Sequence, residues 1–385
     1  MPNTQNEEYQ LDNMLQTFVP YILIYLLTIF FAYRAQAVTT KRNKSLDSSL
    51  HFYIAAISFA LIVGLRWNVG VDYPAYYDLI MGNHTYDSEL GRLELIPRLS
   101  IAIISENGYQ FYLWFIFMAF IQIFFLLKAF KGDLKVFVIW GVFFYLTNHL
   151  EHSMNIIRQE AAMSIILYAY TLLIKGKIKQ YVGWILFASL FHFSSIICLP
   201  FILLSKIQLK LPVYAQLMIY ALIFIYGNDI ISFILDTLLG GFGNFSYISK
   251  LEAIENDEFD IQSGSGLGVL FINFKYILLI LFSRVLSKEY RQHGFDIIYT
   301  ITFIGMCFYR VSMNNQILSR IMMFFTIGFV ICYAMMLMYI ATKTNKTIGI
   351  PFAIGLVMAE IIIVLYKIYT GEPYQFIWDV PNLNL

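Results

Sequence analysis

Residues 66–77 read Arg66-Trp67-Asn68-Val69-Gly70-Val71-Asp72-Tyr73-Pro74-Ala75-Tyr76-Tyr77, and they directly follow the apolar run from His51 to Leu65. Gly70 permits a backbone turn that a side chain would resist, and Pro74 biases Tyr73 towards an extended conformation. The stretch therefore predicts a shaped loop at a membrane surface, rich in hydrogen-bonding groups and aromatic rings.

The composition of the whole chain is that of a membrane protein. Of 385 residues, 59% are hydrophobic and 13% are charged, whereas a soluble protein has roughly 25% charged residues. Apolar runs near 20 residues recur along the chain, and the first, Phe18 to Tyr33, has no basic residue before it and no cleavage pattern. We predict an all-α polytopic membrane protein with a single domain over residues 1–385 and a retained first helix. The three cysteines lie in apolar runs and indicate neither a disulfide framework nor a cysteine metal site.

We expect about ten transmembrane helices, placed by apolar periodicity. Their approximate ranges are 18–34, 51–66, 109–128, 136–148, 156–174, 211–227, 267–284, 294–310, 319–341 and 348–369.

The basic residues set the orientation of these helices, because Lys and Arg collect in cytoplasmic loops. Six clusters hold 17 of the 26 basic residues. The clusters are Arg34 with Lys41, Arg42 and Lys44; Lys128, Lys131 and Lys135; Lys175, Lys177 and Lys179; Lys206 and Lys210; Arg284, Lys288 and Arg291; and Lys343 with Lys346.

The apolar stretch 181–205 lies between two of these clusters, so it must enter and leave on the same side. Twenty-five residues are too few for two spans of about 20 residues each. We predict a helical hairpin, with its apex at His192-Phe193-Ser194-Ser195. The loops 66–108, 149–155, 228–266 and 310–318 and both chain ends then lie outside the cytoplasm. The 228–266 loop, which is rich in glycine and acidic residues, is interpreted as a lid, and a segment from Leu93 to Ile104 as a helix along the outer interface.

Six of the ten arginines lie at this outer face, where their planar guanidinium groups suit phosphate. Arg158 begins an apolar run beside Gln159, and charges in such runs usually mark function. The simpler alternative is that Arg158 pairs with Glu160 or Glu151 and caps its helix. Arg310 and Arg320 flank Asn314, and interfacial snorkelling is the alternative for them.

Asp72 and His192 are the candidate proton acceptors. Asp72 could instead form a salt bridge to Arg66 or cap a turn, and His192 could be a helix-packing group. Arg66 could be an interfacial anchor beside Trp67, and the tyrosines could belong to an aromatic belt rather than stack on sugars.

His149 and His152 are spaced like metal ligands, but no third ligand has recognisable spacing. We therefore predict no metal site and no cofactor. Phosphate-cradling glycine loops and hydrolase motifs are absent from the sequence, and nothing in it suggests nucleotide or nucleic-acid binding.

Four motifs in this order resemble the EpsG-like family of Wzy-type polysaccharide polymerases. They are Arg66 with Gly70-Val71-Asp72-Tyr73 and Tyr76; Asn155 with Arg158-Gln159; His192-Phe193-Ser194-Ser195 before Leu199-Pro200; and Ser319-Arg320. Val71 departs from the family pattern, where a small hydroxyl residue is expected.

The resemblance implies the architecture of the lipid-dependent, metal-independent helical membrane glycosyltransferases. It implies an enzyme of the bacterial inner membrane whose site faces the periplasm, in O-antigen, lipopolysaccharide or exopolysaccharide synthesis. The substrate would be an undecaprenyl-diphosphate-linked oligosaccharide in the lipid bilayer, and a chain-length regulator and a flippase would be further partners.

On this reading Arg158, Arg310 and Arg320 hold the diphosphate, and Asp72 or His192 deprotonates the acceptor hydroxyl. Arg66, Tyr73, Tyr76, Gln159 and Asn314 would bind substrate. Three alternatives remain: a flippase or transporter of lipid-linked glycans, a ligase of the O-antigen type, and a structural subunit of a glycan-assembly complex.

Overall fold

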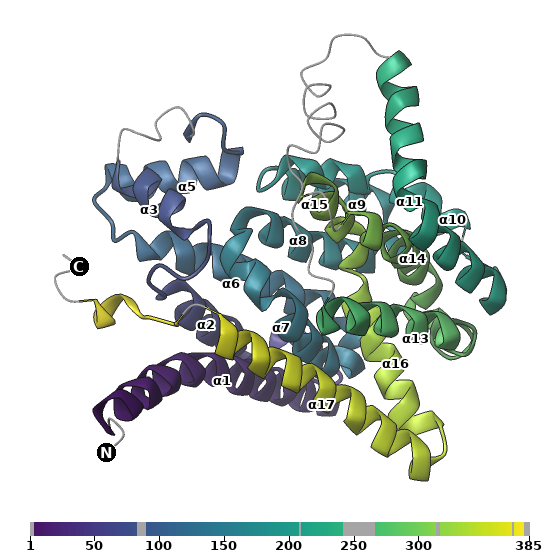
Figure 1. The fold of residues 1–385 in the computed structure, drawn as a ribbon, viewed down its shortest axis with the longest axis horizontal. Helices are drawn as coiled ribbons and strands as arrows, with labels where there is room; N and C mark the ends of the chain where they lie inside the picture. The colour runs from purple at the N-terminus through teal and green to yellow at the C-terminus, as the bar shows by residue number, and fades with distance from the viewer. Residues whose placement is uncertain are drawn as a thin grey trace. The chain divides into compact units, whose positions relative to one another are not determined.

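A computed structural model describes residues 4–82, 90–207, 209–241, 266–312, 316–371 and 373–380 of the chain. These residues form helices and one isolated β-bridge, and they contain no β-strand, so the all-α prediction is confirmed for them. All ten predicted membrane segments fall on helices (Figure 1). The lid predicted over 228–266 falls mostly outside the described residues.

The described chain packs as two units. Unit 1 comprises Met1–Ile196 and Leu337–Leu385, and unit 2 comprises Ile197–Met336. Unit 1 contains α1 (Thr4–Lys41), α2 (Leu50–Gly64), α3 (Tyr73–Met81), α5 (Leu95–Glu106), α6 (Tyr112–Ala129), α7 (Val138–Asn155), α8 (Ile157–Ile174), α9 (Ile178–Ser189) and α17 (Lys346–Thr370). Unit 2 contains α10 (Phe201–Ile207), α11 (Val213–Gly241), α13 (Leu267–Tyr290), α14 (Phe295–Ser312) and α15 (Gln316–Thr326), and α16 (Phe329–Lys343) runs from it into unit 1.

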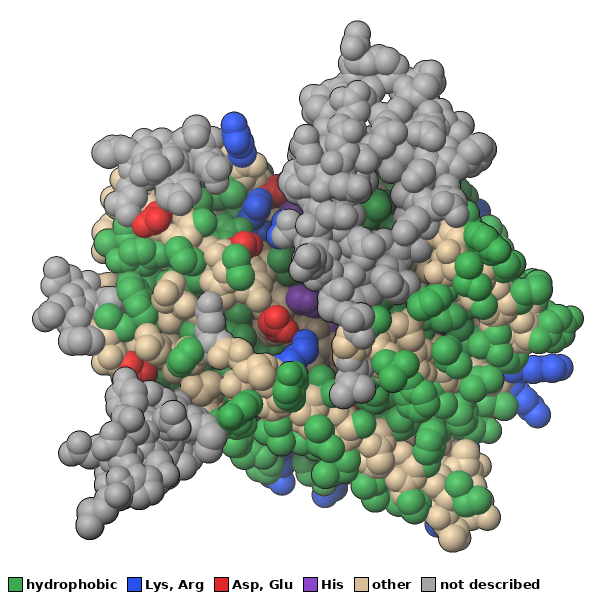
Figure 2. All heavy atoms as spheres, viewed as in Figure 1, with side chains coloured by type: hydrophobic (Ala, Val, Ile, Leu, Met, Phe, Trp, Pro, Cys, Tyr) green, Lys and Arg blue, Asp and Glu red, His purple; other side chains and the backbone are tan. Residues whose placement is uncertain are grey.

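Helix α8 forms the centre of unit 1. Nearly all of its side chains are buried, because it is apolar on every face and packs between α6 and α9. Helices α1 and α17 lie side by side at the surface of this unit, and each exposes large apolar side chains, such as Leu26 and Ile362. Figure 2 shows how much of the described surface in this view is hydrophobic. Such a surface suits a bilayer and not water.

Four described helical segments are long and apolar enough to cross a membrane: Thr17–Lys41, Tyr112–Ala129, Gly268–His293 and Lys346–Thr370. The predicted helix 319–341 is wrong as a single helix, since α15 and α16 meet at a bend of 44°. The hydroxyl of Thr326 turns back to the carbonyls of Met322 and Met323, and Gly328 follows. If the bent pair counts as one span, there are five, so the count of about ten spans stays a prediction.

The helical break predicted at 192–195 is present. Helix α9 ends at Ser189, a short 3-10 turn covers Phe193–Cys198, and α10 begins at Phe201. The chain therefore leaves its helix where a hairpin apex is expected, and the hairpin itself stays a prediction.

The helix ends of unit 1 that carry the lysine clusters lie at one common end of the unit, as the positions of Lys and Arg in the sequence predict. At one end, which we call the lysine end, Lys135 Nζ lies 3.4 Å from the carbonyl of Lys44, and Lys131 donates to the Tyr168 hydroxyl at 3.1 Å. Helices α1, α6 and α8 finish there. At the opposite end, which we call the site end, α2 and α7 finish and α8 begins. The first two lysine clusters therefore share one end of unit 1, away from residues 66–77.

Candidate functional site

The loop after α2 is built around Arg66. Its side chain is 1% exposed and donates to three backbone carbonyls: Nε to Val69 at 2.9 Å, Nη1 to Val63 at 2.6 Å and Nη2 to Met154 at 3.1 Å. A guanidinium fork can satisfy several buried acceptors at once, which an ammonium group cannot do in the same plane. Arg66 therefore joins the end of α2 to the end of α7. Its predicted contact with sugars stays a prediction.

The C-terminal segment pairs with the same loop. The amide of Trp67 donates to the carbonyl of Gln375 at 2.7 Å, and the amide of Ile377 donates to Leu65 at 3.0 Å. Tyr374 is buried and donates its hydroxyl to the carbonyl of Ile62 at 2.5 Å. The loop and the segment after α17 thus lie on one side of unit 1, as the predicted topology requires.

Gly70 brings the loop against the junction of α7 and α8. Its φ is +105°, a value that side chains disfavour, and an added Cβ would lie 2.6 Å from the carbonyl oxygen of Met154. The next amide, that of Val71, donates to Oδ1 of Asn155 at 2.7 Å. Two of the predicted motifs, the Gly70 loop and the Asn155 segment, therefore touch directly.

Tyr73 and Tyr76 have different surroundings in the structure. Tyr73 is 1% exposed, and its ring stacks on Phe115 at 4.4 Å. Tyr76 packs against Trp114, and its hydroxyl accepts a hydrogen bond from Nε of Arg158 at 2.6 Å. Burial raises the pKa of Tyr76, and the positive charge of Arg158 offsets part of this rise.

Arg158 joins a chain of charged groups at the site end. Its Nη1 pairs with Oε2 of Glu94, which precedes α5, and Oε1 of Glu94 lies 3.2 Å from Nδ1 of His192. The same oxygen accepts the amide of Phe193 at 3.1 Å. We call Tyr76, Glu94, Arg158 and His192 the outer cluster. Four segments far apart in the sequence contribute to it.

The charge of Glu94 is set by its neighbours. Burial alone raises the pKa of this carboxyl, but the hydrogen bond from His192 and the positive charge of Arg158 outweigh burial and lower the pKa to about 2. The carboxylate is therefore ionised at neutral pH. The side chains of Arg158, His192 and Glu94 remain 25%, 19% and 16% exposed, so the outer cluster is partly shielded yet accessible.

The alternatives open for Arg158 are settled by its partners. Glu151, at the end of α7, pairs with Lys367 at 3.0 Å, and Glu160 pairs with His149. The expected pairing of Arg158 with Glu160 or Glu151 is wrong, because the guanidinium extends away from its own helix to Glu94. Glu94 was not predicted. It is the single carboxylate between residues 91 and 105, and its place in an apolar segment is the one signal that could have indicated it.

The other predicted site residues are placed as follows. Asp72 is half-buried at the N-cap position directly before α3, and its side chain makes no capping hydrogen bond to that helix. Gln159 is buried within α8. Arg310 and Arg320 lie on α14 and α15 of unit 2, and Asn314 lies outside the described residues.

Two adjoining cavities open beside the loop in unit 1. One, of about 430 Å³, is lined by the backbone around Gly70, by Asn155, and by Glu151 with Lys367. The other, of about 500 Å³, is apolar and lies between α1, α7 and α17. The two share Tyr21, Tyr25, Thr147, Val364 and Ile368. A pocket of mixed polar and apolar lining therefore continues into an apolar groove.

A family model matches this chain over residues 49–378, from the start of α2 to the C-terminal segment that pairs with the loop. The chain belongs to the EpsG family. The family is associated with Wzy-type polymerases and exopolysaccharide biosynthesis, which confirms the resemblance seen in the sequence and suggests a polymerase-like function. Neither a curated protein nor a solved structure matches the chain.

Proposed function

We propose that this EpsG-family protein is a Wzy-type polysaccharide polymerase. It moves a growing glycan from undecaprenyl diphosphate onto a new lipid-linked repeat unit at the periplasmic face of the inner membrane. The single observation that carries the proposal is the outer cluster, in which Glu94 holds Arg158 and His192 on its two oxygens. A cation beside an oriented base is what transfer from a diphosphate needs.

The transfer exchanges one bond for another. A hydroxyl of the acceptor sugar attacks the anomeric carbon of the donor, the bond from that carbon to the diphosphate oxygen breaks, and undecaprenyl diphosphate leaves with the bonding electrons. The hydroxyl proton passes to a base. Negative charge grows on the leaving diphosphate, and guanidinium groups stabilise such charge by paired hydrogen bonds.

His192 is the base that the geometry favours over Asp72. When its Nδ1–H donates to Glu94, the other ring nitrogen is unprotonated and can accept a proton. Glu94 is then a positioning residue, which fixes the ring and stabilises the imidazolium that forms. Arg158, held by Glu94 and Tyr76, stabilises the charge of the leaving group in this proposal.

The two cavities of unit 1 fit the shape of a lipid-linked sugar. The apolar groove between α1 and α17 suits a polyprenyl chain, and the pocket beside Gly70 suits a diphosphate or a sugar. Lys367 lines this pocket and pairs with Glu151. A diphosphate that entered the pocket would replace the Glu151 carboxylate as the partner of Lys367.

Reconstitution in liposomes tests the function directly. Purified protein is given lipid-diphosphate repeat units with no nucleotide and no added metal ion. We expect lipid-linked chains of several repeats. Repeats that only change leaflet would indicate a flippase, transfer onto a different lipid acceptor would indicate a ligase, and either result would overturn the proposal.

A further inference from the structure

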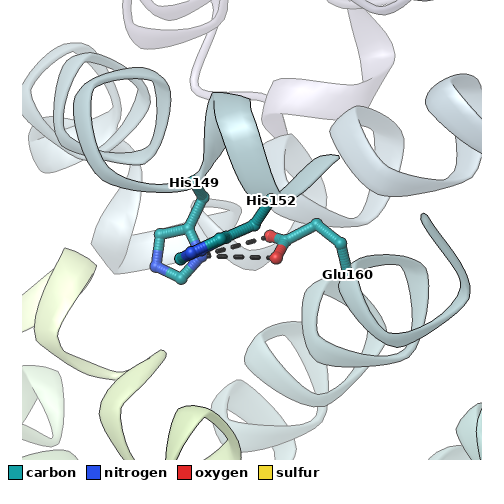
Figure 3. Close-up of side chains that lie close together, drawn as sticks. All are labelled: His149, His152 and Glu160. Carbon is teal, nitrogen blue, oxygen red and sulfur yellow. Dashed lines mark hydrogen bonds and ion pairs between the residues drawn. The ribbon is translucent and has the colours of Figure 1, made fainter. Parts of the chain in front are cut away.

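Three side chains from α7 and α8 point towards one another at the site end of unit 1. They are His149 and His152 on α7 and Glu160 on α8, and Figure 3 shows them facing a common point. One ligand atom from each lies within 4.8 Å of the others. The sequence offered two of these residues, but the third comes from the next helix and has no recognisable local spacing.

Glu160 needs a positive partner. Its side chain is fully buried, and moving a carboxylate out of water is costly unless a cation accompanies it. Within the described part of the chain, its ion pair is with Nδ1 of His149, at 3.3 Å from Oε1. That pair is ionic only if the histidine is protonated.

His152 has an unmet requirement of its own. Its Nδ1 is buried and has no hydrogen-bond partner among the described residues. The ring lies edge-on to His149, with centroids 5.7 Å apart.

We infer that His149, His152 and Glu160 bind a divalent transition-metal ion. Two imidazoles and one carboxylate are a ligand set that Zn²⁺ accepts, with a fourth position left for water. Ligand atoms around a tetrahedral zinc ion lie about 3.4 Å apart, since each bond is roughly 2.0–2.1 Å long. The His149–Glu160 distance of 3.3 Å already fits, and the third ligand atom would have to move inward by at most about 1.4 Å.

The surroundings of His149 support a ligand role. Its ring stacks on Tyr145 with centroids 5.3 Å apart and an angle of 5° between the planes. Packing of this kind fixes the orientation of a ligand ring, as groups around metal sites commonly do.

The position of the ion gives it a task separate from the glycosyl transfer. It would join the end of α7 to the start of α8 across Ile156, where the helix is interrupted at φ −96° and ψ 55°. This junction carries Met154 and Asn155, which hold the Gly70 loop, and Arg158 of the outer cluster. The ion would therefore fix the positions of Met154, Asn155 and Arg158 relative to one another without touching substrate.

Metal content of the purified full-length protein tests this inference without any activity measurement. The protein is treated with a chelator, dialysed against Zn²⁺, and analysed for bound metal. We expect about one ion per chain, and a rise in the midpoint of thermal unfolding of roughly 5 °C at saturating Zn²⁺. Co²⁺ in place of Zn²⁺ should give a visible absorption band typical of nitrogen and oxygen ligands.

Two variants remove single ligands and one serves as a control. Glu160→Gln keeps the shape of the side chain, and His152→Ala removes a side chain that is only half-buried. If one of these variants fails to fold, zinc binding can still be measured on the other. Both should lose the ion and the stabilisation by Zn²⁺, whereas His51→Ala, at the lysine end, should keep both. Absence of stoichiometric Zn²⁺ in the unmodified protein, or its retention by both folded ligand variants, would overturn the inference.

Discussion

The Nδ1 atom of His192 lies 3.2 Å from Oε1 of Glu94, and Arg158 pairs with the other oxygen of the same carboxylate. One side chain thus orients a base, from the turn after α9, and a cation, from the first turn of α8. The proposed mechanism depends on this shared carboxylate, whereas a purely structural ion network would stabilise the fold without affecting the rate of transfer.

Arg158→Lys should lower chain lengthening at least tenfold while the amount of protein in the membrane stays normal. Lysine keeps the charge, but it cannot reach Glu94 and the Tyr76 hydroxyl with two separate donors. Polymer length and yield in cells that depend on the variant provide the measurement. Arg98→Lys, on the exposed side of α5, is the matched control. Full polymer length in Arg158→Lys would remove the guanidinium from the mechanism.

Arg66→Lys should act on stability rather than on chemistry. The single nitrogen of lysine cannot reach all three buried carbonyls of Val63, Val69 and Met154, so at least one loses its donor, at a cost of roughly 2–4 kcal/mol in the free energy of unfolding. Thermal unfolding of the purified variant measures this loss, with the exposed Arg92→Lys as the control. An unchanged unfolding midpoint together with lost activity would instead support a direct contact between Arg66 and sugar.

Gly70→Ala should reduce activity about tenfold or destabilise the loop, whereas Gly82→Ala should have a much smaller effect. Both glycines have positive φ, +105° and +71°, but only Gly82 lies in the left-handed helical region that a side chain can adopt at modest cost. A Cβ at Gly70 would strike the Met154 carbonyl, while a Cβ at Gly82 meets nothing within 4 Å. Equal effects of the two changes, in polymer yield and in thermal unfolding, would show that contact with α7 is unimportant.

Stability at low pH should depend on Glu94. Its pKa is lowered from 4.5 to about 2 by folding, so its stabilising contribution is complete above pH 4.5 and is lost as the pH falls towards 2. Unfolding midpoints measured between pH 6 and pH 3 should therefore fall more steeply for the unmodified protein than for Glu94→Gln. Glu106→Gln, at the exposed end of α5, the helix that Glu94 precedes, should behave like the unmodified protein. Parallel curves for Glu94→Gln and the unmodified protein would contradict the ion pairs described here.

The sequence predicts the helices of this protein better than its site. Apolar runs locate the helices, and the lysines near Lys44 and Lys135 identify one end of unit 1, because both signals are local or statistical. The outer cluster is a tertiary feature: Glu94 and His192 meet only when α5 and the end of α9 are packed together. Tyr73 and Arg66 looked like surface groups because an aromatic or charged residue after a membrane helix usually meets water. Here the C-terminal segment and α7 cover them, and no pattern near residue 66 could have shown that.

The rate of chain lengthening in a double-mutant cycle tests the central claim most directly. Glu94→Gln, His192→Ala and the double variant are reconstituted in liposomes with lipid-diphosphate repeat units, and single-turnover rates are compared with that of the unmodified protein. If Glu94 acts in part by orienting His192, each single variant should fall at least tenfold, and the loss in the double variant should be clearly smaller than the product of the two single losses. Losses that simply add in the double variant, or full rates in folded single variants, would contradict the proposed site.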